Sequence, residues 1–509
     1  MEPLALTGND LTFKGLYEVV YAGREAALAA SARGSVEASR AVVERLLASG
    51  ATAYGINTGF GELSTVRIAA DQVRQLQTNL VRSHACGVGA ALTEAETRAM
   101  MLLRANALAK GLSGVRPVVI ETLCAMLGRG VHPVIPSQGS VGASGDLAPL
   151  AHLALVAIGE GEAVLRGERM AGGEAMRRTG IAPLALEAKE GLALLNGTQG
   201  MLALGALALR EAWVLSDTAD AAAGMSLDAL RGSPAAFDAR IQQARPLGGQ
   251  AVVAERLRRM NEGSEIRESH RSVARDPRVQ DAYSLRCTPQ VHGAARDVLE
   301  QAGRTLEIEL NSATDNPLVF PATSGAPEAV LSGGNFHGQP LAMAADQMAL
   351  AIATLAGISE RRIEHMTNPH TSLLPAFLVA NPGLNSGFMM LQVTAAALAS
   401  ETKTLAAPHS VDSIPTSANQ EDYVSMGMAA ARRLRPMLEN LRNMLAIELL
   451  CACQGIDLLA PLRTSEAGRK VHALVRSVSA KVEQDRVMAG DIAAVAALIA
   501  EGKIARLVP

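Results

Sequence analysis

Three long stretches of the chain carry apolar residues at helical spacing with few interruptions, and they constrain the fold more than any other feature. Residues 340–366, 389–407 and 425–455 each match the period of a long helix. Their faces hold more apolar residues than one bundle seam needs, so we expect burial against further copies of the chain. Aromatic residues, which strands prefer, make up only 3% of the 509 residues. The sequence therefore predicts a mainly α fold, with a long central helix bundle and a smaller mixed, loop-rich N-terminal region.

Local signals predict several helix ends. Thr93 and Glu96 have the spacing of a capping box, in which each residue satisfies a backbone N–H of the other. Pro117 suits the first turn of a helix, where its missing N–H is not needed. Ser35 is predicted to cap a helix that closes at Gly50.

The periodic pattern also divides the chain into two regions. We expect residues 1–205 to form the N-terminal region and residues 206–509 to form the bundle with the C-terminal helices. Within them, residues 231–290 lack periodicity and predict a long functional loop. Residues 312–339 predict a loop that contains a small hairpin.

Charge and cysteine content exclude several classes of protein. The formal net charge is −3 without a basic stripe, so we expect no nucleic-acid partner. The five cysteines are odd in number and lack metal-ligand spacing, which predicts reduced thiols and no metal site. The N-terminus shows no secretory signal. The apolar residues 192–209 are interrupted by polar ones and predict a buried helix rather than a membrane span, so we expect a cytoplasmic protein.

The glycine-crowded run 139–152 is the most informative segment for function. It ends abruptly in Asp-Leu-Ala-Pro, which predicts the start of a helix. A backbone this uncluttered can bring one amide nitrogen close to another residue's carbonyl carbon. Gly145 offers the least hindered nitrogen and Ala143 a nearly bare carbonyl, while Ser144 carries a hydroxyl that can leave as water.

Two other motifs do not fit the residues of this run, and one further interpretation stays open. A phosphate-binding loop needs Gly-Lys-Ser/Thr at its end, but Asp146 follows Gly145. A nucleophile elbow needs a glycine two residues after Ser144, where Asp146 stands. A tight structural turn that caps a helix remains the alternative from this segment alone.

The run resembles the prosthetic-group signature of the aromatic amino acid ammonia-lyases, a family that includes histidine, phenylalanine and tyrosine enzymes. The resemblance implies that Ala143, Ser144 and Gly145 cyclise and lose two waters to form 4-methylidene-imidazol-5-one. This group is an electrophile made from the chain itself, so no external cofactor is expected. Protein side chains are nucleophiles, acids and bases, so an enzyme that needs an electron sink must import or build one.

Further segments match the family in the same order along nearly the whole chain. Residues 53–61 resemble the family's tyrosine loop, which implies that Tyr54 is a catalytic acid or base. The block 280–287 is similar residue by residue, and it implies that Tyr283 takes part in the chemistry and Arg286 binds the substrate carboxylate.

The resemblance also implies residues that shape the substrate site. These are Asn196 beside the prosthetic ring, Gln280 in the tyrosine-arginine block, Asn316 near the amine and Phe336 at the substrate. The family forms homotetramers whose sites combine loops from three chains, which would account for the surplus apolar helix faces.

Two positions predict which amino acid is the substrate. In residues 80–85, His84 stands where the histidine enzymes carry histidine, and its ring can exchange a hydrogen bond with an imidazole. Glu421 stands where those enzymes carry a glutamate, which can hold an imidazole N–H but would be unpaired beside a phenyl ring. Tyr423 departs from the histidine enzymes, in which a histidine usually follows Gln-Glu-Asp. L-Histidine is the expected substrate, and the alternatives are a tyrosine or phenylalanine ammonia-lyase, a related aminomutase, or a catalytically idle helical scaffold.

Overall fold

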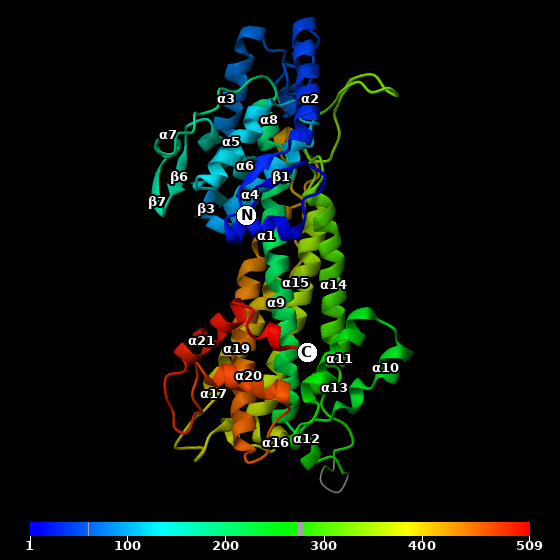
Figure 1. The fold of residues 1–509 in the computed structure, drawn as a ribbon, viewed down its shortest axis with the longest axis vertical. Coiled ribbons are helices and arrows are strands. Elements are labelled where there is room, and N and C mark those ends of the chain that lie inside the picture. The colour runs from blue at the N-terminus through cyan, green and yellow to red at the C-terminus, as the bar shows by residue number, and fades with distance from the viewer. Residues whose placement is uncertain (60, 273–275, 277) are drawn as a thin grey trace. The chain divides into compact units, whose positions relative to one another are not determined.

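Helices make up most of the chain, as its composition predicts (Figure 1). The structure is a computed structural model that describes residues 1–59, 61–272, 276 and 278–509. The chain forms two compact units. The first holds Met1–Leu207, Gly303–Asp346 and Pro408–Arg432, and the second holds Ala208–Ala302, Gln347–Ala407 and Arg433–Pro509. The first segment of the first unit ends at Leu207, two residues beyond the predicted boundary. Residues 206–509, which the sequence predicted to form one region, are divided between the two units.

The first unit combines helices with four small sheets. Its helices are α1 (Phe13–Ala22), α2 (Ala30–Ser49), α3 (Val73–His84), α4 (Glu94–Ala109), α5 (Pro117–Gly128), α6 (Leu147–Ala157), α7 (Gly172–Arg178), α8 (Glu190–Leu195) and α18 (Gly427–Arg432). Its strands are β1 (Leu4–Leu6), β2 (Ala26–Leu28), β3 (Val88–Ala91), β4 (Val131–Pro133), β5 (Pro136–Gln138), β6 (Glu162–Leu165), β7 (Glu168–Ala171), β8 (Leu318–Phe320) and β9 (Ala329–Leu331). One sheet pairs β1 with β2 in parallel. The other three sheets are antiparallel, and they pair β3 with β5, β4–β6–β7 in that order, and β8 with β9.

The second unit consists of helices and the loops between them, with no named strand among its described residues. Three long helices, α9 (Gln199–Ala229), α14 (Thr288–Leu310) and α15 (Gln339–Thr367), contribute residues to both units. The others are α10 (Ala239–Ala244), α11 (Gly248–Asn261), α12 (Glu265–Ser269), α13 (Tyr283–Arg286), α16 (Pro369–Ser372), α17 (Met389–Leu405), α19 (Leu434–Leu458), α20 (Glu466–Arg476) and α21 (Ala489–Ala500). Short 3₁₀ turns occur at Gly61–Thr65, Ala70–Gln72, Pro234–Phe237, Ala376–Leu378, Ser417–Asn419 and Ala505–Leu507.

The long-helix predictions are confirmed for α15 and α17, but the third is wrong. Residues 425–455 form two helices, α18 and α19, which are separated at Arg433. Pro436 lies in the first turn of α19, and its missing N–H cannot bond to the carbonyl four residues earlier, so a continuous helix is disfavoured there. Met426 has a left-handed φ of 54°, so the residues before α18 do not continue the helix.

The local signals succeed where the residues satisfy each other. The capping box is confirmed, because the Thr93 N–H donates to Glu96 Oε2 at 2.7 Å and the Glu96 N–H donates to Thr93 Oγ1 at 3.3 Å. Pro117 begins α5, and Gly50 closes α2 in a left-handed conformation. The Ser35 cap is wrong, because α2 begins five residues earlier, at the end of β2, in an alanine-rich segment of high helix propensity.

Of the two loop predictions, for residues 231–290 and 312–339, the structure confirms only the second. The hairpin predicted within residues 312–339 is confirmed as β8 and β9. The long loop predicted for residues 231–290 is wrong for much of its length, because α10 to α13 lie there, although residues 273–275 and 277 are outside the described residues.

One described helix, α15, is long and apolar enough to cross a membrane by length and composition alone. Of its most apolar window, 67% is buried inside the protein, as expected of a core helix. Residues 192–209 instead form α8 and the start of α9, with a break at residues 196–198.

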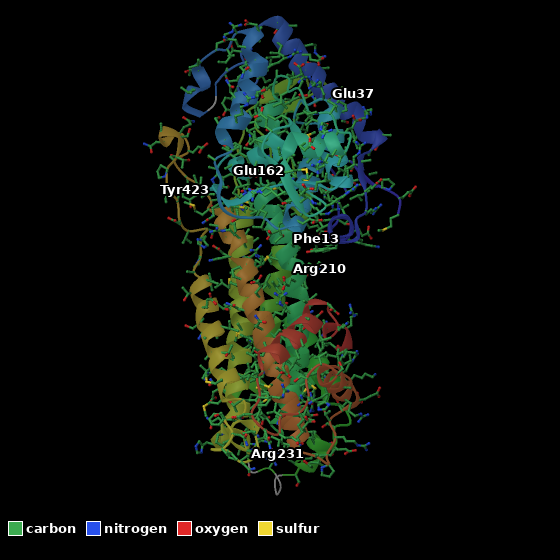
Figure 2. All side chains as sticks on the ribbon, turned by 90° about the vertical axis from the view of Figure 1, so that its left-hand side faces the viewer. Phe13, Glu37, Glu162, Arg210, Arg231 and Tyr423 are labelled. Carbon is green, nitrogen blue, oxygen red and sulfur yellow. The ribbon has the colours of Figure 1, made fainter. Side chains whose placement is uncertain are left out.

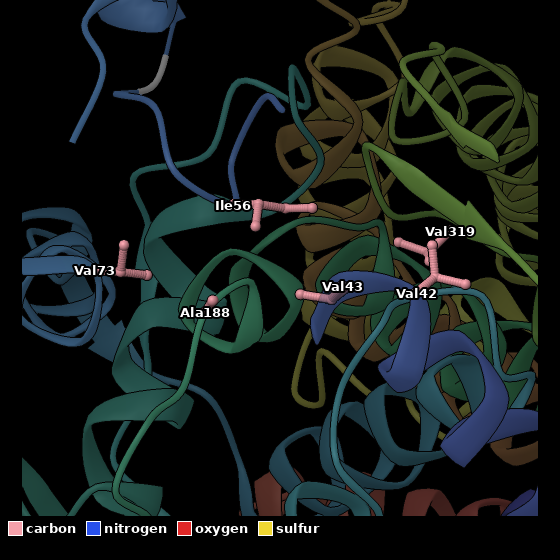
Figure 3. Close-up of a cluster of buried hydrophobic side chains, with 6 residues drawn as sticks. All are labelled: Val42, Val43, Ile56, Val73, Ala188 and Val319. Carbon is pink, nitrogen blue, oxygen red and sulfur yellow. The ribbon is translucent and has the colours of Figure 1, made fainter. Parts of the chain in front are cut away.

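A buried apolar cluster supports the segment that carries Tyr54 (Figure 3). Ile56, two residues after Tyr54, is fully buried within it. The other members come from α2, α3, β8 and the segment before α8, and they are Val42, Val43, Val73, Ala188 and Val319. Burying a side chain of this size stabilises a fold by roughly 1.5–3 kcal/mol. The cluster therefore fixes the backbone from which Tyr54 projects.

Two buried aspartates on α9 in the second unit have opposite charge environments. Burial raises the pKa of Asp228 to about 6, and hydrogen bonds from Thr464 and Ser264 only partly offset this effect. Burial also acts to raise the pKa of Asp220, but the bond and charge of His292, with two arginines, hold it below its usual value. Asp228 therefore keeps its proton up to about pH 6, whereas Asp220 stays ionised at lower pH than a free aspartate does.

The Asp228→Asn variant should become more stable relative to the wild-type protein as pH rises from 4 to 7. Folding strengthens proton binding at Asp228, so ionising it costs stability between its unfolded pKa of about 4 and its folded pKa of about 6. Asparagine avoids that cost, which is roughly 2–3 kcal/mol at pH 7. Thermal unfolding midpoints of both proteins across this range measure the difference.

Asp220→Asn is the matched control, because its sign is reversed. Its loss of stability should be present at pH 7 and should shrink as pH falls through the depressed pKa of Asp220. Two variants that shift in the same direction with pH would contradict this assignment.

Candidate active site

A cavity of about 560 Å³ lies in the first unit, and the glycine-rich loop forms part of its wall. Its size is typical of a small-molecule site with an apolar lining and a few convergent polar groups. The lining residues are Tyr54, Gly59, Gly61, Leu63, Val66, Ile68, Leu76, Asn79, Leu80, Ser83, His84, Ser144, Leu147, Leu192, Asn196, Asn316, Ser417 and Glu421. Six of the predicted site residues are therefore brought together around one cavity: Tyr54, His84, Ser144, Asn196, Asn316 and Glu421.

The loop that carries Ser144 is held tightly by the backbone of Gly197. Ser144 and Gly145 both have left-handed φ values, 53° and 73°. The Asp146 N–H donates to the Gly197 carbonyl at 2.7 Å, and the Gly197 N–H donates to the Ser144 carbonyl at 3.3 Å. A Cβ atom on Gly145 would lie 2.0 Å from the Gly197 carbonyl oxygen, so only glycine fits this approach.

The segment that precedes α18 holds the other end of the loop. The Met426 N–H donates to the Val141 carbonyl at 2.8 Å, and the Ser425 hydroxyl donates to the Gly142 carbonyl at 3.2 Å. A Cβ atom on Gly142 would lie 2.0 Å from Ser425 Oγ. The departure from helix geometry at Met426 is thus part of what positions the loop.

Asp146 links the loop to the start of α9. Its carboxylate is fully buried, accepting from the Ser140 hydroxyl at 2.9 Å and from the Met201 N–H at 2.8 Å. Burial raises the pKa of Asp146 to about 6, while these hydrogen bonds favour the ionised form. An acidic group at this place can therefore hold or release a proton near neutral pH.

Tyr54 presents its hydroxyl group to the cavity from the turn before the first 3₁₀ segment. The Gly61 N–H donates to this hydroxyl at 3.4 Å. Burial, together with the charge of Glu421, raises the pKa of Tyr54 despite that bond. The phenol is therefore protonated at neutral pH before a ligand binds.

His84 is the last residue of α3, and its ring is oriented by its own helix. Nδ1 lies 2.9 Å from the Leu80 carbonyl oxygen, which can only accept, so Nδ1 carries the hydrogen. Burial lowers the pKa of His84, although the Leu80 bond and the charge of Glu421 oppose this shift. The ring is thus neutral near pH 7, and its Nε2 atom is a hydrogen-bond acceptor.

Glu421 contacts the serine of the loop directly. The Ser144 hydroxyl donates to Glu421 Oε1 at 3.3 Å, and the Thr416 hydroxyl donates to Glu421 Oε2 at 2.6 Å. The carboxylate is therefore held by one group and faces the loop with its other oxygen.

Asn196 and Asn316 form a pair on the same wall. Asn196 Nδ2 donates to the Asn316 carbonyl at 2.9 Å, and Asn316 Oδ1 accepts from the Gly333 N–H at 2.9 Å. The buried Asn196 Oδ1 has no hydrogen-bond partner among the described residues. Because an unpaired buried oxygen is costly, it is an acceptor available to a ligand N–H.

Six predicted site residues do not line this cavity: Ala143 and Gly145, which flank Ser144 in the loop, and Gln280, Tyr283, Arg286 and Phe336. Gln280, Tyr283 and Arg286 belong to the second unit, where the guanidinium of Arg286 lies over the Tyr283 ring at 4.6 Å from its centroid. Tyr283 is 70% exposed, and Arg286 Nε is buried with no partner among the described residues. Phe336 is half-buried in the first unit.

Sequence reasoning missed several lining residues. Asn79 and Leu80 lie about one helical turn before His84 on α3, so helical spacing alone could have indicated them. Thr416, which positions Glu421, gave no comparable signal in the sequence. Among the described residues, no cluster of three or more His, Cys, Asp or Glu side chains has the arrangement of a metal site.

Tyr423, the residue that departs from the histidine enzymes, is 57% exposed. It is labelled in Figure 2. Its ring lies nearly parallel to that of His337 at a centroid distance of 6.2 Å, and the Tyr423 carbonyl lies 3.1 Å from His337 Nε2. It is not a lining residue of the cavity that Glu421 faces.

Comparison with known proteins places the chain in one family. The profile of the aromatic amino acid lyase family matches residues 11–477. The chain is 57% identical to histidine ammonia-lyase of Koribacter versatilis (strain Ellin345), over 99% of both chains. Among solved structures, it is similar to histidine ammonia-lyase from Trypanosoma cruzi, with 46% identity, a TM-score of 0.91 and coverage of 99% and 95% of the two chains. It is also similar to tyrosine aminomutase from Streptomyces globisporus, with 38% identity, a TM-score of 0.94 and coverage of 99% and 98%. The chain belongs to the aromatic amino acid lyase family.

Gly145→Ala should weaken the fold of the loop more than a left-handed glycine alone would explain. The added methyl group overlaps the Gly197 carbonyl, so we expect loss of the Asp146 and Ser144 bonds to Gly197 and faster amide exchange at Asp146. Gly130→Ala is the control, because Gly130 has a similar φ of 72° and nothing within 4 Å of an added Cβ. The control should lose about 1 kcal/mol, and equal losses in the two variants would contradict a steric role for Gly145.

Proposed function

We propose that the chain is a histidine ammonia-lyase, a carbon–nitrogen lyase that converts L-histidine to trans-urocanate and ammonia. The observation that carries the proposal is that Ser144, His84 and Glu421 line the same cavity. The full-length similarity to histidine ammonia-lyases supports the same substrate.

The loop fits formation of 4-methylidene-imidazol-5-one from its own residues. Cyclisation joins the Gly145 nitrogen to the Ala143 carbonyl carbon, and it needs a tight backbone and a free N–H. Ser144 and Gly145 both have left-handed backbone conformations, and the Gly145 N–H donates no hydrogen bond among the described residues. The finished group would supply an electrophile for the α-amine of the substrate, with no external cofactor.

The residues around the loop can bind and orient the amine and move protons. Asn196 Oδ1 can accept from the substrate ammonium group, which satisfies an oxygen that is otherwise buried and unpaired. Tyr54 holds a proton at its hydroxyl group, and its raised pKa opposes early loss of that proton. A tyrosine that acts as base near pH 7 costs about 4 kcal/mol at the ordinary pKa, so the positive charge of a bound substrate must favour its deprotonation.

Two acceptors on the cavity wall match the side chain of histidine. His84 Nε2 carries a lone pair because Nδ1 bonds to Leu80, and Glu421 is a second acceptor. An imidazole ring offers N–H donors to these acceptors, whereas a phenyl ring would leave both desolvated and unpaired. The site therefore favours histidine over phenylalanine by the number of satisfied polar groups.

The proposed active form is a cytoplasmic homotetramer in which chains share sites. Exposed Tyr283, with Arg286 beside it, offers a proton-handling hydroxyl and a carboxylate-binding fork to a site in another chain, as the family resemblance implies. Gln280 and Phe336 would complete that site. Exposed apolar residues on α15 and α17, Met343, Leu350, Met390 and Val393, are suited to burial between chains. A sizing experiment that returns an active single chain would contradict this assembly.

The direct test of the function is an ultraviolet assay of the purified protein with L-histidine, L-tyrosine and L-phenylalanine in parallel. Urocanate should form from histidine, with little cinnamate or coumarate from the other two. Ser144→Ala removes the hydroxyl group that must leave, so turnover should fall by at least about 1000-fold without loss of the fold. Full activity of Ser144→Ala would contradict the proposed chemistry. Coumarate or cinnamate as the main product would contradict the substrate assignment.

His84→Phe should lower kcat/KM for L-histidine by roughly 100-fold or more, because it removes an acceptor that only a ring with N–H groups can use. The same variant should raise the relative rate with L-phenylalanine, and that rate is the internal control for damage to the chemistry. If turnover of all three amino acids fell by the same factor, His84 would not determine specificity.

A further inference from the structure

Arg104 is a fully buried arginine on α4 that contacts the backbone behind the proposed site. Its Nη1 atom donates to the Asn196 carbonyl at 2.7 Å and to Gln199 Oε1 at 2.7 Å. Gln199 is held in turn, because its Nε2 donates to Thr314 Oγ1 at 2.8 Å. The charge of Arg104 is thus aimed at one peptide group, the one that joins Asn196 to Gly197.

Keeping a cation here is energetically expensive. The Nε and Nη2 atoms of Arg104 have no hydrogen-bond partner among the described residues. The nearby carboxylate of Asp315 is paired with a second buried cation, because Lys189 Nζ lies 2.6 Å from Asp315 Oδ2. Burial lowers the pKa of Arg104 to about 10, with Asp315 only partly offsetting the effect. Replacing such a half-satisfied buried charge by an apolar side chain is often neutral or stabilising, so the fold alone does not explain Arg104.

The position of Gly197 makes the contact possible. A Cβ atom at residue 197 would lie 2.4 Å from Arg104 Nη1 and 2.5 Å from Gln199 Oε1. The missing side chain therefore lets the guanidinium group reach the Asn196 carbonyl, while the Gly197 N–H, on the same peptide, points to the Ser144 carbonyl at 3.3 Å.

These contacts form a chain from the guanidinium group to Ser144. A cation on the oxygen of a peptide increases the positive charge on its N–H, because hydrogen bonds in series polarise each other. The Asn196–Gly197 peptide thereby becomes a stronger donor to the Ser144 carbonyl oxygen. A stronger donor at that oxygen makes the Cα–H of Ser144 more acidic, since the charge left after proton loss resides largely on the oxygen.

We infer that Arg104 is a positioning residue for the dehydration of Ser144, acting through the Asn196–Gly197 peptide. The inference rests on the proposed function, which requires that dehydration. In this step the Cα–H bond of Ser144 breaks and its proton passes to water. The electron pair forms the Cα–Cβ double bond, and the Cβ–Oγ bond breaks. The hydroxyl group leaves as hydroxide and is protonated to water, so one water is lost and no oxidant or reductant is needed.

The negative charge that develops during the step lies on the Ser144 carbonyl oxygen. The Gly197 N–H stabilises it there, and Arg104 strengthens that hydrogen bond from the far side of the peptide. Glu421 holds the hydroxyl group that leaves. Arg104 itself touches neither the substrate cavity nor Ser144.

The test follows the mass of the full-length protein with time after cell-free synthesis, using folded material only. The wild-type protein should lose the mass of two waters. Arg104→Met should fold with a thermal midpoint near that of the wild-type protein, but should lose the second water roughly tenfold more slowly or worse. The rate of water loss does not depend on substrate turnover, so it separates assembly of the site from its use.

Arg98→Met is the matched control. Arg98 lies on the same helix, is half-buried and donates to the Val19 and Val20 carbonyls, away from Asn196. It should lose both waters at the wild-type rate, whatever its effect on stability. A comparable delay in Arg98→Met and Arg104→Met would overturn the inference.

Two conservative variants test the charge even if Arg104→Met does not fold. Arg104→Lys keeps the charge and Arg104→Gln keeps an N–H donor without it, so lysine should restore more of the dehydration rate than glutamine. A glutamine variant as fast as the lysine variant, or an Arg104→Met protein as fast as wild type, would overturn the inference alone. A wild-type protein that retains both waters would contradict the proposed function together with it.

Discussion

The structure of this site depends on two hydrogen bonds between the backbone of Gly197 and residues 144–146. They bring the Ser144 carbonyl and the Asp146 N–H against one glycine, at a distance that excludes a side chain on Gly145. Backbone bonds of this kind are unaffected by side-chain rotamers, so the loop is held in one conformation before any ligand arrives. The proposed electrophile requires such a conformation, because a nitrogen must meet a carbonyl carbon two residues earlier in the chain.

Two buried ionisable side chains, Asp146 and Arg104, lie close to this backbone contact. Asp146 lies on one side, joined to α9 through Met201, and Arg104 lies on the other, joined to Asn196. Each is fully buried, and burial shifts the pKa of each toward its neutral form. Such groups contribute little to stability relative to well-packed apolar side chains, but they create a fixed electric field at the loop. The apolar cluster around Ile56 supports another part of the cavity wall, the segment that carries Tyr54.

Local signals in the sequence predicted those helix ends that depend only on contacts between neighbouring residues. Thr93 with Glu96 and Pro117 at the start of α5 involve contacts within one helical turn, so their outcome could be predicted from the sequence. The helix predicted over residues 425–455 was wrong at its start, because Met426 departs from helix geometry and bonds to Val141, which is far away in the sequence. The break at Arg433 lies beside Pro436, a signal that the sequence itself contains. The motifs predicted six of the eighteen residues that line the cavity, but the bond between Ser144 and Glu421 joins residues 277 positions apart. Arg104 acts through contacts with residues more than 90 positions away, and no motif indicated it. Thr416 bonds to Glu421 only five positions on, but no motif indicated it either.

An electron-density map of the purified protein at residues 143–145 is the most direct test of the proposed electrophile. We expect continuous density for a five-membered ring that joins the Ala143 carbonyl carbon to the Gly145 nitrogen, with no density for the Ser144 hydroxyl group. An open chain in fully active protein, with the Ser144 hydroxyl group still bonded to Glu421, would contradict the proposal.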